Sequence, residues 1–459
     1  MRSLLNESLE QSSLLYQGID GIRDRVMRSS HYAILLHRWE GKEILFDDLV
    51  KGQGVPRSLP GYAKFAGFCA NAQKYGCNYG WIDTTCIDKS SSTELDESIR
   101  SMFTWYQNAE VCIVHLSGIS RRGKMAEEEQ WFTRGWTLQE LLAPRKLKFY
   151  DNAWNEVFED RYDIDCTPSS HLAGQPLMYP ATASSALGQI AQISGIDKHT
   201  LLSYRPSAQK ARTVFYWLSR RRTTRPEDMA YCLIGLLDVQ LAIAYGEGLE
   251  RAFFRLQVEC AMQMRDRDLF MWTGSSSKWN SMFAKLPSAF STKPESSVTA
   301  TYLNSQVQID TIPFDPTVNL TNHGLRIAVI LYELNDLRDI RRVDDRISML
   351  FYLSLPRGHC TGTLTLKWAI DPMLVGGMVH GWQLAVLGGK DHPLDKPCFF
   401  DGHPSVPSVG SYPAYILLQV EDPRVYRYSR IATAEFGDLD ISYDSLGLNA
   451  KPPQIVYIE

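Results

Sequence analysis

Short apolar runs alternate with helix-like stretches along the first 155 residues of the chain. The runs have the length and composition of strands that are buried on both faces. They are Tyr32–Leu36, Tyr79–Asp83, Val111–Leu116 and Leu147–Tyr150. Between them, apolar residues recur at helical spacing over Gly61–Gly76, after Thr93 and over Gly135–Ala143. Strict alternation of strand and helix predicts an α/β fold, with a parallel sheet covered by helices on both faces.

The start of the second of these helices carries a local signal of its own. Thr93 is followed three residues later by Asp96, a spacing that resembles a capping box. The helix that it opens places apolar side chains on one face, at Leu95, Ile99, Met102, Phe103 and Tyr106. We therefore expect this helix to begin at Thr93.

The pattern changes twice beyond residue 155. Residues 156–275 are mainly helical in character, most clearly over Ala211–Arg220, Asp228–Leu237 and Leu249–Met264. The Ser-rich segment Gly274–Ser277 is typical of a linker. After it, β-branched or alternating runs recur between Gly and Pro, including Leu325–Tyr332, Ser348–Leu355, Gly362–Trp368 and Tyr415–Val420. We expect three domains: an α/β domain (1–155), a helical extension (156–275) and a β-rich, sandwich-like domain (276–459).

Composition narrows the classes of function. The net charge is −4, so nothing in the overall charge favours nucleic acid or an anionic membrane as a partner. The nine cysteines follow no regular spacing and form no CxxC or Cys/His cluster, which indicates reduced thiols and no metal site. The longest apolar run, Cys232–Ala244, contains Asp238 and is too short to span a bilayer. These features predict a cytoplasmic protein without a membrane span.

The segment Trp136–Leu141 is the most informative candidate for chemistry. Glu140 follows Trp136 by four residues, so a carboxylate and a large ring share one helical face. Ligands of parallel α/β sheets usually bind at the carboxyl ends of the strands, next to such helices. Glu140 is therefore the candidate catalytic residue. A buried structural carboxylate and a core tryptophan remain the alternatives.

Three sequence blocks resemble the HET domain, the heterokaryon-incompatibility module of filamentous fungi. They are YAILLHRW at Tyr32–Trp39, WIDTTCIDK at Trp81–Lys89 and RGWTLQELLAP at Arg134–Pro144. The segment Arg222–Leu233 is similar to the helical extension that often follows this domain. The resemblance covers about the first 275 residues.

The resemblance implies a fold and an activity. HET domains are similar to TIR domains, which have a flavodoxin-like parallel sheet and a Trp-Cys-Leu-x-Glu-Leu helix whose glutamate is needed to cleave NAD. Trp136–Leu141 matches this pattern except at Thr137, where cysteine is usual. It implies NAD or a related nucleotide as a substrate rather than a bound cofactor, with Glu140 stabilising the sugar cation as nicotinamide leaves. Self-association or another incompatibility protein would act as the partner in self/non-self cell-death signalling.

Further candidates for ligand binding lie at the ends of the first two strands. His37, Arg38 and Trp39 follow the first strand, and Asp83 ends the second. With Trp136, they are the ligand-binding residues that we predict. For His37 a satisfied loop histidine is the competing interpretation, and for Asp83 a turn-forming or helix-capping role.

Besides Thr137, the chain departs from the family pattern at three positions. Leu36 and Glu40 stand where serine and glycine are common, and Thr85 replaces a cysteine. Leu36 removes a hydroxyl near the expected pocket, which suggests a second hypothesis. A diverted HET scaffold would shape an apolar small molecule in secondary-metabolite biosynthesis, as a cyclase or Diels-Alder-type pericyclase. A non-catalytic interaction module is the third hypothesis.

Overall fold

The computed structural model describes the chain from residue 31 onward, with gaps. The described ranges are 31–39, 41, 43–50, 57–118, 130–159, 162–166, 183–264, 268–292 and 318–333, followed by the strands up to residue 459. The chain divides into two compact units, Met1–Arg205 and Pro206–Glu459.

The first unit is built on a five-stranded sheet with the order β2-β1-β3-β4-β5. The strands are β1 (Tyr32–His37), β2 (Tyr79–Ile82), β3 (Val111–His115), β4 (Lys146–Tyr150) and β5 (Ile164–Asp165). The first four run parallel, as expected, whereas the short β5 pairs antiparallel with β4. The α/β fold with a parallel sheet is confirmed, and the closer likeness to flavodoxin or TIR domains stays a prediction.

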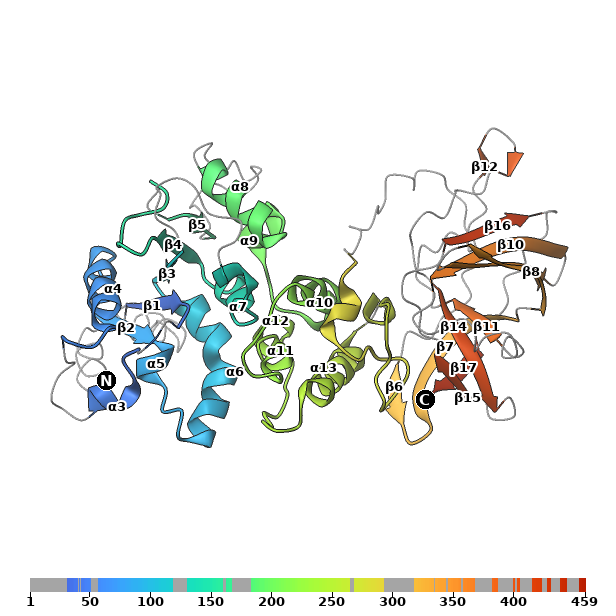
Figure 1. Cartoon of the computed structure of the whole chain (residues 1–459), viewed down its shortest axis with the longest axis horizontal. Helices are drawn as coiled ribbons and strands as arrows, with labels where there is room; N and C mark the ends of the chain where they lie inside the picture. The colour runs from blue at the N-terminus through green and yellow to red at the C-terminus, as the bar shows by residue number, and fades with distance from the viewer. Residues whose placement is uncertain are drawn as a thin grey trace, which may run out of the picture. The chain divides into compact units, whose positions relative to one another are not determined.

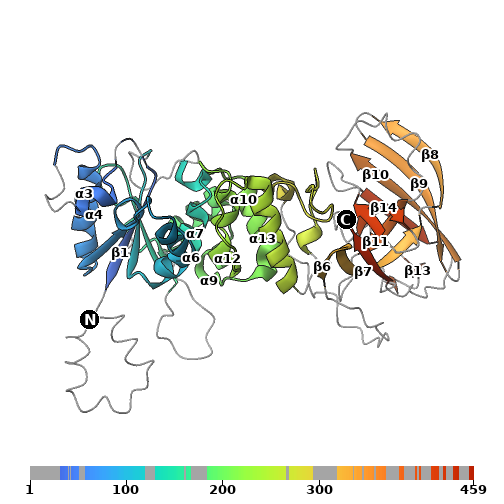
Figure 2. The same ribbon diagram turned by 90° about the horizontal axis from the view of Figure 1, so that it is seen from below.

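Helices cover both faces of this sheet (Figures 1 and 2). Helix α4 (Tyr62–Lys74) lies on one face, and α6 (Ser92–Asn108) and α7 (Thr137–Leu142) lie on the other. The unit also contains α3 (Phe46–Val50), α5 (Asp83–Cys86), η2 (Gln130–Thr133), α8 (Ala183–Ser194) and α9 (Lys198–Ser203). Helix α9 contacts both β5 and α7, so the chain beyond residue 155 still belongs to this unit.

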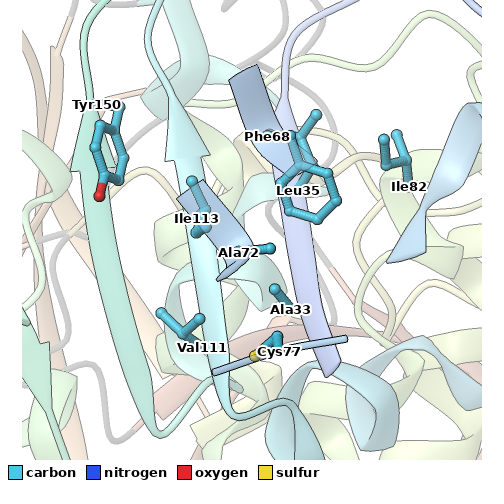
Figure 3. Packing of buried hydrophobic residues seen from close by; sticks show 9 residues of the cluster. All are labelled: Ala33, Leu35, Phe68, Ala72, Cys77, Ile82, Val111, Ile113 and Tyr150. Atoms are coloured by element: carbon cyan, nitrogen blue, oxygen red, sulfur yellow. The ribbon is translucent and has the colours of Figure 1, made fainter. Parts of the chain in front are cut away.

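The core between α4 and the sheet follows from the alternation of side chains along the strands (Figure 3). Ala33 and Leu35 of β1 face α4 and pack against Phe68 and Ala72. The remaining members of this cluster are Cys77, Ile82, Val111, Ile113 and Tyr150. Residues at odd positions of β1 and β3 therefore face α4, and His37, the last residue of β1, continues this series.

The amino end of α6 corrects the expected capping box. Ser91, not Thr93, is the N-cap: its backbone is extended and its hydroxyl accepts a hydrogen bond from the Glu94 amide. The Glu94 carboxylate accepts from the amide of Asp88, 2.9 Å away. Ser91 and Glu94 have the same spacing as Thr93 and Asp96, so the sequence holds two overlapping signals. The earlier one begins the helix, and Thr93 lies inside the first turn.

A buried ion pair fixes the connection between β4 and β5. Lys148 and Asp163 are fully buried, and their charged groups lie 3.2 Å apart. Lys148 also donates to the Phe158 carbonyl at 2.6 Å, and Asp163 accepts from the Phe149 amide at 2.7 Å. These hydrogen bonds compensate for the loss of water around the two charges.

The second unit begins with helices and continues into strands. The helices are η3 (Ala208–Lys210), α10 (Ala211–Ser219), α11 (Asp228–Tyr231), α12 (Ile234–Leu237), α13 (Leu249–Gln263), η4 (Asp268–Phe270) and η5 (Pro287–Phe290). They confirm the expected helical stretches, with Asp228–Leu237 split into two short helices. The expected linker is packed instead: Ser277 donates to the Phe283 carbonyl, and Lys285 donates to that of Ser275.

The strands of the second unit confirm its β-rich character, whereas a sandwich arrangement stays a prediction. Six strands form a sheet in the order β11-β14-β15-β17-β7-β6, four form β16-β10-β9-β8, and β12 pairs with β13. The bounds are β6 (Asn319–Thr321), β7 (Gly324–Glu333), β8 (Asn335–Val343), β9 (Arg346–Leu355), β10 (Gly358–Lys367), β11 (Trp382–Val386), β12 (Phe399–Phe400), β13 (His403–Pro404), β14 (Tyr415–Asp422), β15 (Arg427–Arg430), β16 (Asp438–Tyr443) and β17 (Gln454–Ile458).

Two further expectations from the sequence concern the cysteines and membrane-spanning helices. The seven cysteines whose side chains the structure describes are all free thiols. Within the described part of the chain, no helix combines the length and the apolar character that crossing a bilayer requires.

The first prediction concerns the buried ion pair. Asp163→Ala removes the fully buried carboxylate beside Lys148 and leaves the more exposed Glu156, 3.3 Å from Lys148 Nζ, as its acidic partner. We therefore expect a loss in the free energy of unfolding at the lower end of about 3–5 kcal/mol. Asp96→Ala is the control, because it removes an exposed pair with Arg100 and should cost at most about 1 kcal/mol. Urea unfolding of both variants measures the difference. Equal losses would show that the buried pair does not stabilise the fold.

The second prediction concerns the turn between β6 and β7. Gly324 has a φ of +105°, and a Cβ there would lie 2.5 Å from the Ile458 carbonyl oxygen of β17. Gly274 has a φ of +96°, and a Cβ added at Gly274 would have no neighbouring atom within 4 Å. Both alanine variants suffer the unfavourable φ, but only Gly324→Ala also meets a backbone atom. We expect it to be less stable than Gly274→Ala by about 1–3 kcal/mol in urea unfolding. Equal stability would mean that β17 moves away without cost.

Candidate functional site

The carboxyl ends of the parallel strands bring several polar side chains to one edge of the sheet. His37 ends β1 and is the register partner of His115, which ends β3. Asp83 directly follows β2 and begins α5. Because this edge is where open α/β sheets bind their ligands, it is the candidate site.

His37 is a buried polar residue at this edge. Its side chain is 2% exposed, and its Nε2 atom lies 3.9 Å from Asp83 Oδ1, beyond hydrogen-bond distance. Neither ring nitrogen has a hydrogen-bond partner among the described residues. Burial lowers the pKa of His37 well below its usual value, and the nearby Lys64, His115, Arg134 and Lys89 lower it further. The imidazole is therefore neutral near pH 7.

A small hollow opens beside this imidazole on the α4 side of the sheet. Its polar lining includes His37, Glu43, Lys64, Thr84 and Thr85, and its apolar lining includes Leu35, Ile44, Phe65 and Ile82. The volume is about 10 Å³, roughly what one water molecule needs.

A second group of side chains surrounds Asp83. The indole nitrogen of Trp39 donates to both carboxylate oxygens, at 3.0 and 3.3 Å. Lys89 Nζ lies 3.6 Å from Asp83 Oδ2 and 3.5 Å from the centre of the Trp39 ring. Burial raises the pKa of the Asp83 carboxyl, and Lys89, Trp39 and Arg134 oppose this shift. The fold thus brings the predicted Trp39 and Asp83 together with a lysine that we did not single out.

The side chain of Lys64 contacts the backbone of Arg38. Lys64 Nζ donates to the Arg38 carbonyl at 3.2 Å and lies 2.7 Å from the Glu43 carboxylate. Arg134 approaches the same edge and donates to the His37 carbonyl at 3.4 Å. The contact that the structure gives for Arg38 is therefore made by its carbonyl, which helps to hold Lys64 at the hollow.

The predicted Trp136 is the N-cap of α7 and lies one helical turn before the predicted Glu140, as expected. The Glu140 amide donates to the Trp136 carbonyl at 3.4 Å, and both side chains are partly buried. Burial is the largest cause that raises the pKa values of the Tyr106 hydroxyl and the Cys112 thiol, and the charge of Glu140 is the second largest. Asp83 also raises the pKa of Tyr106. Glu140 and Asp83 therefore act on the same phenol, although they come from different helices.

Three of the four departures from the family pattern have structural roles, whereas Glu40 lies outside the described residues. Thr137 is buried, and its hydroxyl donates to the carbonyls of Trp131 at 2.6 Å and Arg134 at 2.8 Å, which ties η2 to α7. The Thr85 hydroxyl donates to the Ile82 carbonyl at 3.3 Å. Leu36 is 2% exposed, is paired with Val114 in the sheet and is absent from the lining of the hollow.

Sequence reasoning missed Trp154 at this edge. Its φ is +62°, a left-handed conformation that is rare for a bulky residue. The centre of the Trp154 ring lies 4.7 Å from that of the His115 ring. The Trp154 ring also fills the space beside Gly67, because a Cβ added at Gly67 would lie 2.1 Å from Trp154 Nε1. Asp151 holds the turn by accepting from the amides of Ala153 and Asn155. The Asp-x-x-Trp-Asn turn after the fourth strand was the available signal.

Among the described residues, no group of three or more His, Cys, Asp or Glu side chains is arranged to hold a metal ion.

Comparison with known proteins gives two matches. Residues 32–128 match the model of the family described as "Heterokaryon incompatibility protein (HET)", a match that ends before α7. The chain is also 37% identical over 245 residues to "Vegetative incompatibility protein HET-E-1" of Podospora anserina. That alignment covers 49% of this chain but only 16% of the relative. No solved structure matches the chain.

The third prediction follows from the neutral state of His37. Below pH 6.5 the unfolded chain binds a proton at this residue and the folded chain does not, so stability falls as the pH falls. The slope reaches at most about 1.4 kcal/mol per pH unit. We expect His37→Gln to lose less stability than the wild type between pH 7.5 and 5.5 in urea unfolding.

The control for this experiment is His199→Gln, which alters an exposed histidine of α9 and should keep the pH dependence of the wild type. The same pH dependence in the wild type and in His37→Gln would contradict a neutral buried imidazole.

Proposed function

We propose, on the premise that the chain carries a HET domain, that it acts in heterokaryon incompatibility and binds a nucleotide at the carboxyl edge of its parallel sheet. Two features support this proposal: the match to an incompatibility protein and the cluster of His37, Trp39 and Asp83 at that edge. Another incompatibility protein or a second copy of the chain is the proposed partner in the signalling.

The proposed reaction is the hydrolysis of NAD. The bond between the ribose C1′ and the nicotinamide nitrogen breaks, its electron pair leaves with nicotinamide, and the sugar carries a positive charge in the transition state. A carboxylate that is already in place stabilises this charge without reorganisation. Water then supplies the hydroxyl at C1′ and releases a proton, which gives ADP-ribose.

The position of Glu140 is the observation that carries this proposal. Its carboxylate is partly buried on α7, one turn from Trp136, and affects the same Tyr106 phenol as Asp83. Burial of this kind strengthens the attraction between a carboxylate and a sugar cation, because little water screens it.

No observation specifically favours the biosynthetic alternative. It rested partly on Leu36, whose side chain is buried in the sheet and does not line the hollow. The replacement of a serine at this position therefore alters the core and not the described lining of the hollow. A non-catalytic interaction module is distinguished from the proposed hydrolase by the experiment that follows.

The fourth prediction concerns Glu140 and NAD. In a lysate or with the purified chain, Glu140→Ala should slow the loss of NAD by about 100-fold or more, the effect of removing one preorganised stabilising group. Glu97→Ala, which removes an exposed carboxylate of α6, should leave the rate unchanged. Glu140→Gln tests the charge separately from the packing. Equal rates in the wild type and Glu140→Ala would remove Glu140 from the mechanism, and no loss of NAD with either would argue against hydrolysis.

A further inference from the structure

The two lysines around the hollow already have acidic partners. Lys64 lies 2.7 Å from Glu43, and Lys89 lies 3.6 Å from Asp83. Arg134 donates to the His37 carbonyl. Lys64 is the only lysine or arginine in the described lining and is matched by Glu43, so the lining itself does not offer the excess of positive charge that a phosphate group needs.

The imidazole of His37 defines what kind of atom fits beside it. The ring is neutral, so one nitrogen donates a hydrogen bond and the other accepts one. Both nitrogens are buried and have no hydrogen-bond partner among the described residues, although buried polar groups of folded proteins nearly always have one. A carboxylate or a phosphate only accepts, and an ammonium only donates. A hydroxyl does both.

The size of the hollow leads to the same conclusion. It has room for about one water-sized atom, as a hydroxyl oxygen requires, whereas a phosphate carries several oxygens. Thr84 and Thr85 contribute to its lining, and the Asp83 carboxylate lies 3.9 Å from His37. Next to Asp83, Trp39 is 46% exposed, with Lys89 Nζ over its ring at 3.5 Å from the ring centre. Hydroxyls, a carboxylate and an aromatic ring together suit a sugar.

We propose that the hollow binds a hydroxyl of a neutral sugar ring, with His37 as the residue that exchanges hydrogen bonds with it, and that it excludes phosphate. This inference rests on the proposed nucleotide-binding function and specifies which part of a nucleotide contacts β1. The ribose hydroxyls lie at His37, and the phosphates lie outside the hollow.

The fifth prediction uses the whole chain and a probe without phosphate or base, methyl β-D-ribofuranoside. Binding is measured by saturation-transfer NMR at pH 7.5. We expect the wild type to bind the riboside, and His37→Phe to bind it about tenfold more weakly because the hydrogen-bonding nitrogens are lost. The 2-deoxy analogue should bind the wild type more weakly than the riboside, and inorganic phosphate should not displace the riboside.

Two further variants make the outcome decisive. His199→Phe introduces the same side chain at an exposed position and should bind like the wild type. Thr84→Val removes a hydroxyl from the lining with little change in volume and should weaken binding of the riboside. This variant provides the test if His37→Phe does not fold. The inference is overturned if the wild type binds no riboside, if phosphate displaces it, or if folded His37→Phe binds as well as the wild type. If His37→Phe does not fold, unchanged binding by Thr84→Val overturns it.

This experiment is independent of NAD turnover. A chain that binds the riboside through His37 but consumes no NAD would retain the sugar site and lose the proposed hydrolysis. A chain that consumes NAD through Glu140 but binds the riboside equally well with folded His37→Phe would retain the hydrolysis and lose the sugar site.

Discussion

The position of β1 between β2 and β3 is the constraint from which the first unit follows. This strand pairs in parallel with β2 through Leu35 and Ile82, and with β3 through His37 and His115. Parallel neighbours run in the same direction, so the three carboxyl ends must meet along one edge. The side chains of the first strand are nearly all buried, and a shift of one residue would turn each of them to the opposite face. The register that buries Ala33 and Leu35 therefore also places His37 beside His115.

The two faces of the sheet present different chemistry at this edge. On the α4 side, a neutral imidazole, two threonines and paired charges surround a hollow that holds about one water molecule. From the opposite side, α7 brings Glu140 to the surroundings of Tyr106 and Cys112. Asp83 connects the two sides, because it lies near His37 and also affects Tyr106. A ligand that contacts both sides would be held by hydrogen bonds on one and by charge on the other.

The pairing of Lys64 with Glu43 and of Lys89 with Asp83 affects which ligands this edge can attract. An isolated lysine in a partly dry site would attract an anion strongly, but one already paired with a carboxylate attracts it far less. Burial and the neighbouring cations also keep the His37 imidazole neutral near pH 7, because both lower its pKa. A neutral imidazole can both donate and accept a hydrogen bond, which is the property on which the proposed sugar contact rests.

The sequence by itself determined the strands, the helices and their alternation, because burial imposes a period that local residues reveal. It also placed Glu140 one turn from Trp136 and Asp83 at the end of the second strand. It did not identify the β5 strand or the true N-cap of α6, because two residues of strand and two overlapping Ser/Thr signals carry too little local information. Only the tertiary structure decided that Lys89 covers Trp39, that Trp154 fills the space above Gly67 and that His37 is neutral. These features depend on contacts between segments distant in the chain and on the water that those contacts exclude.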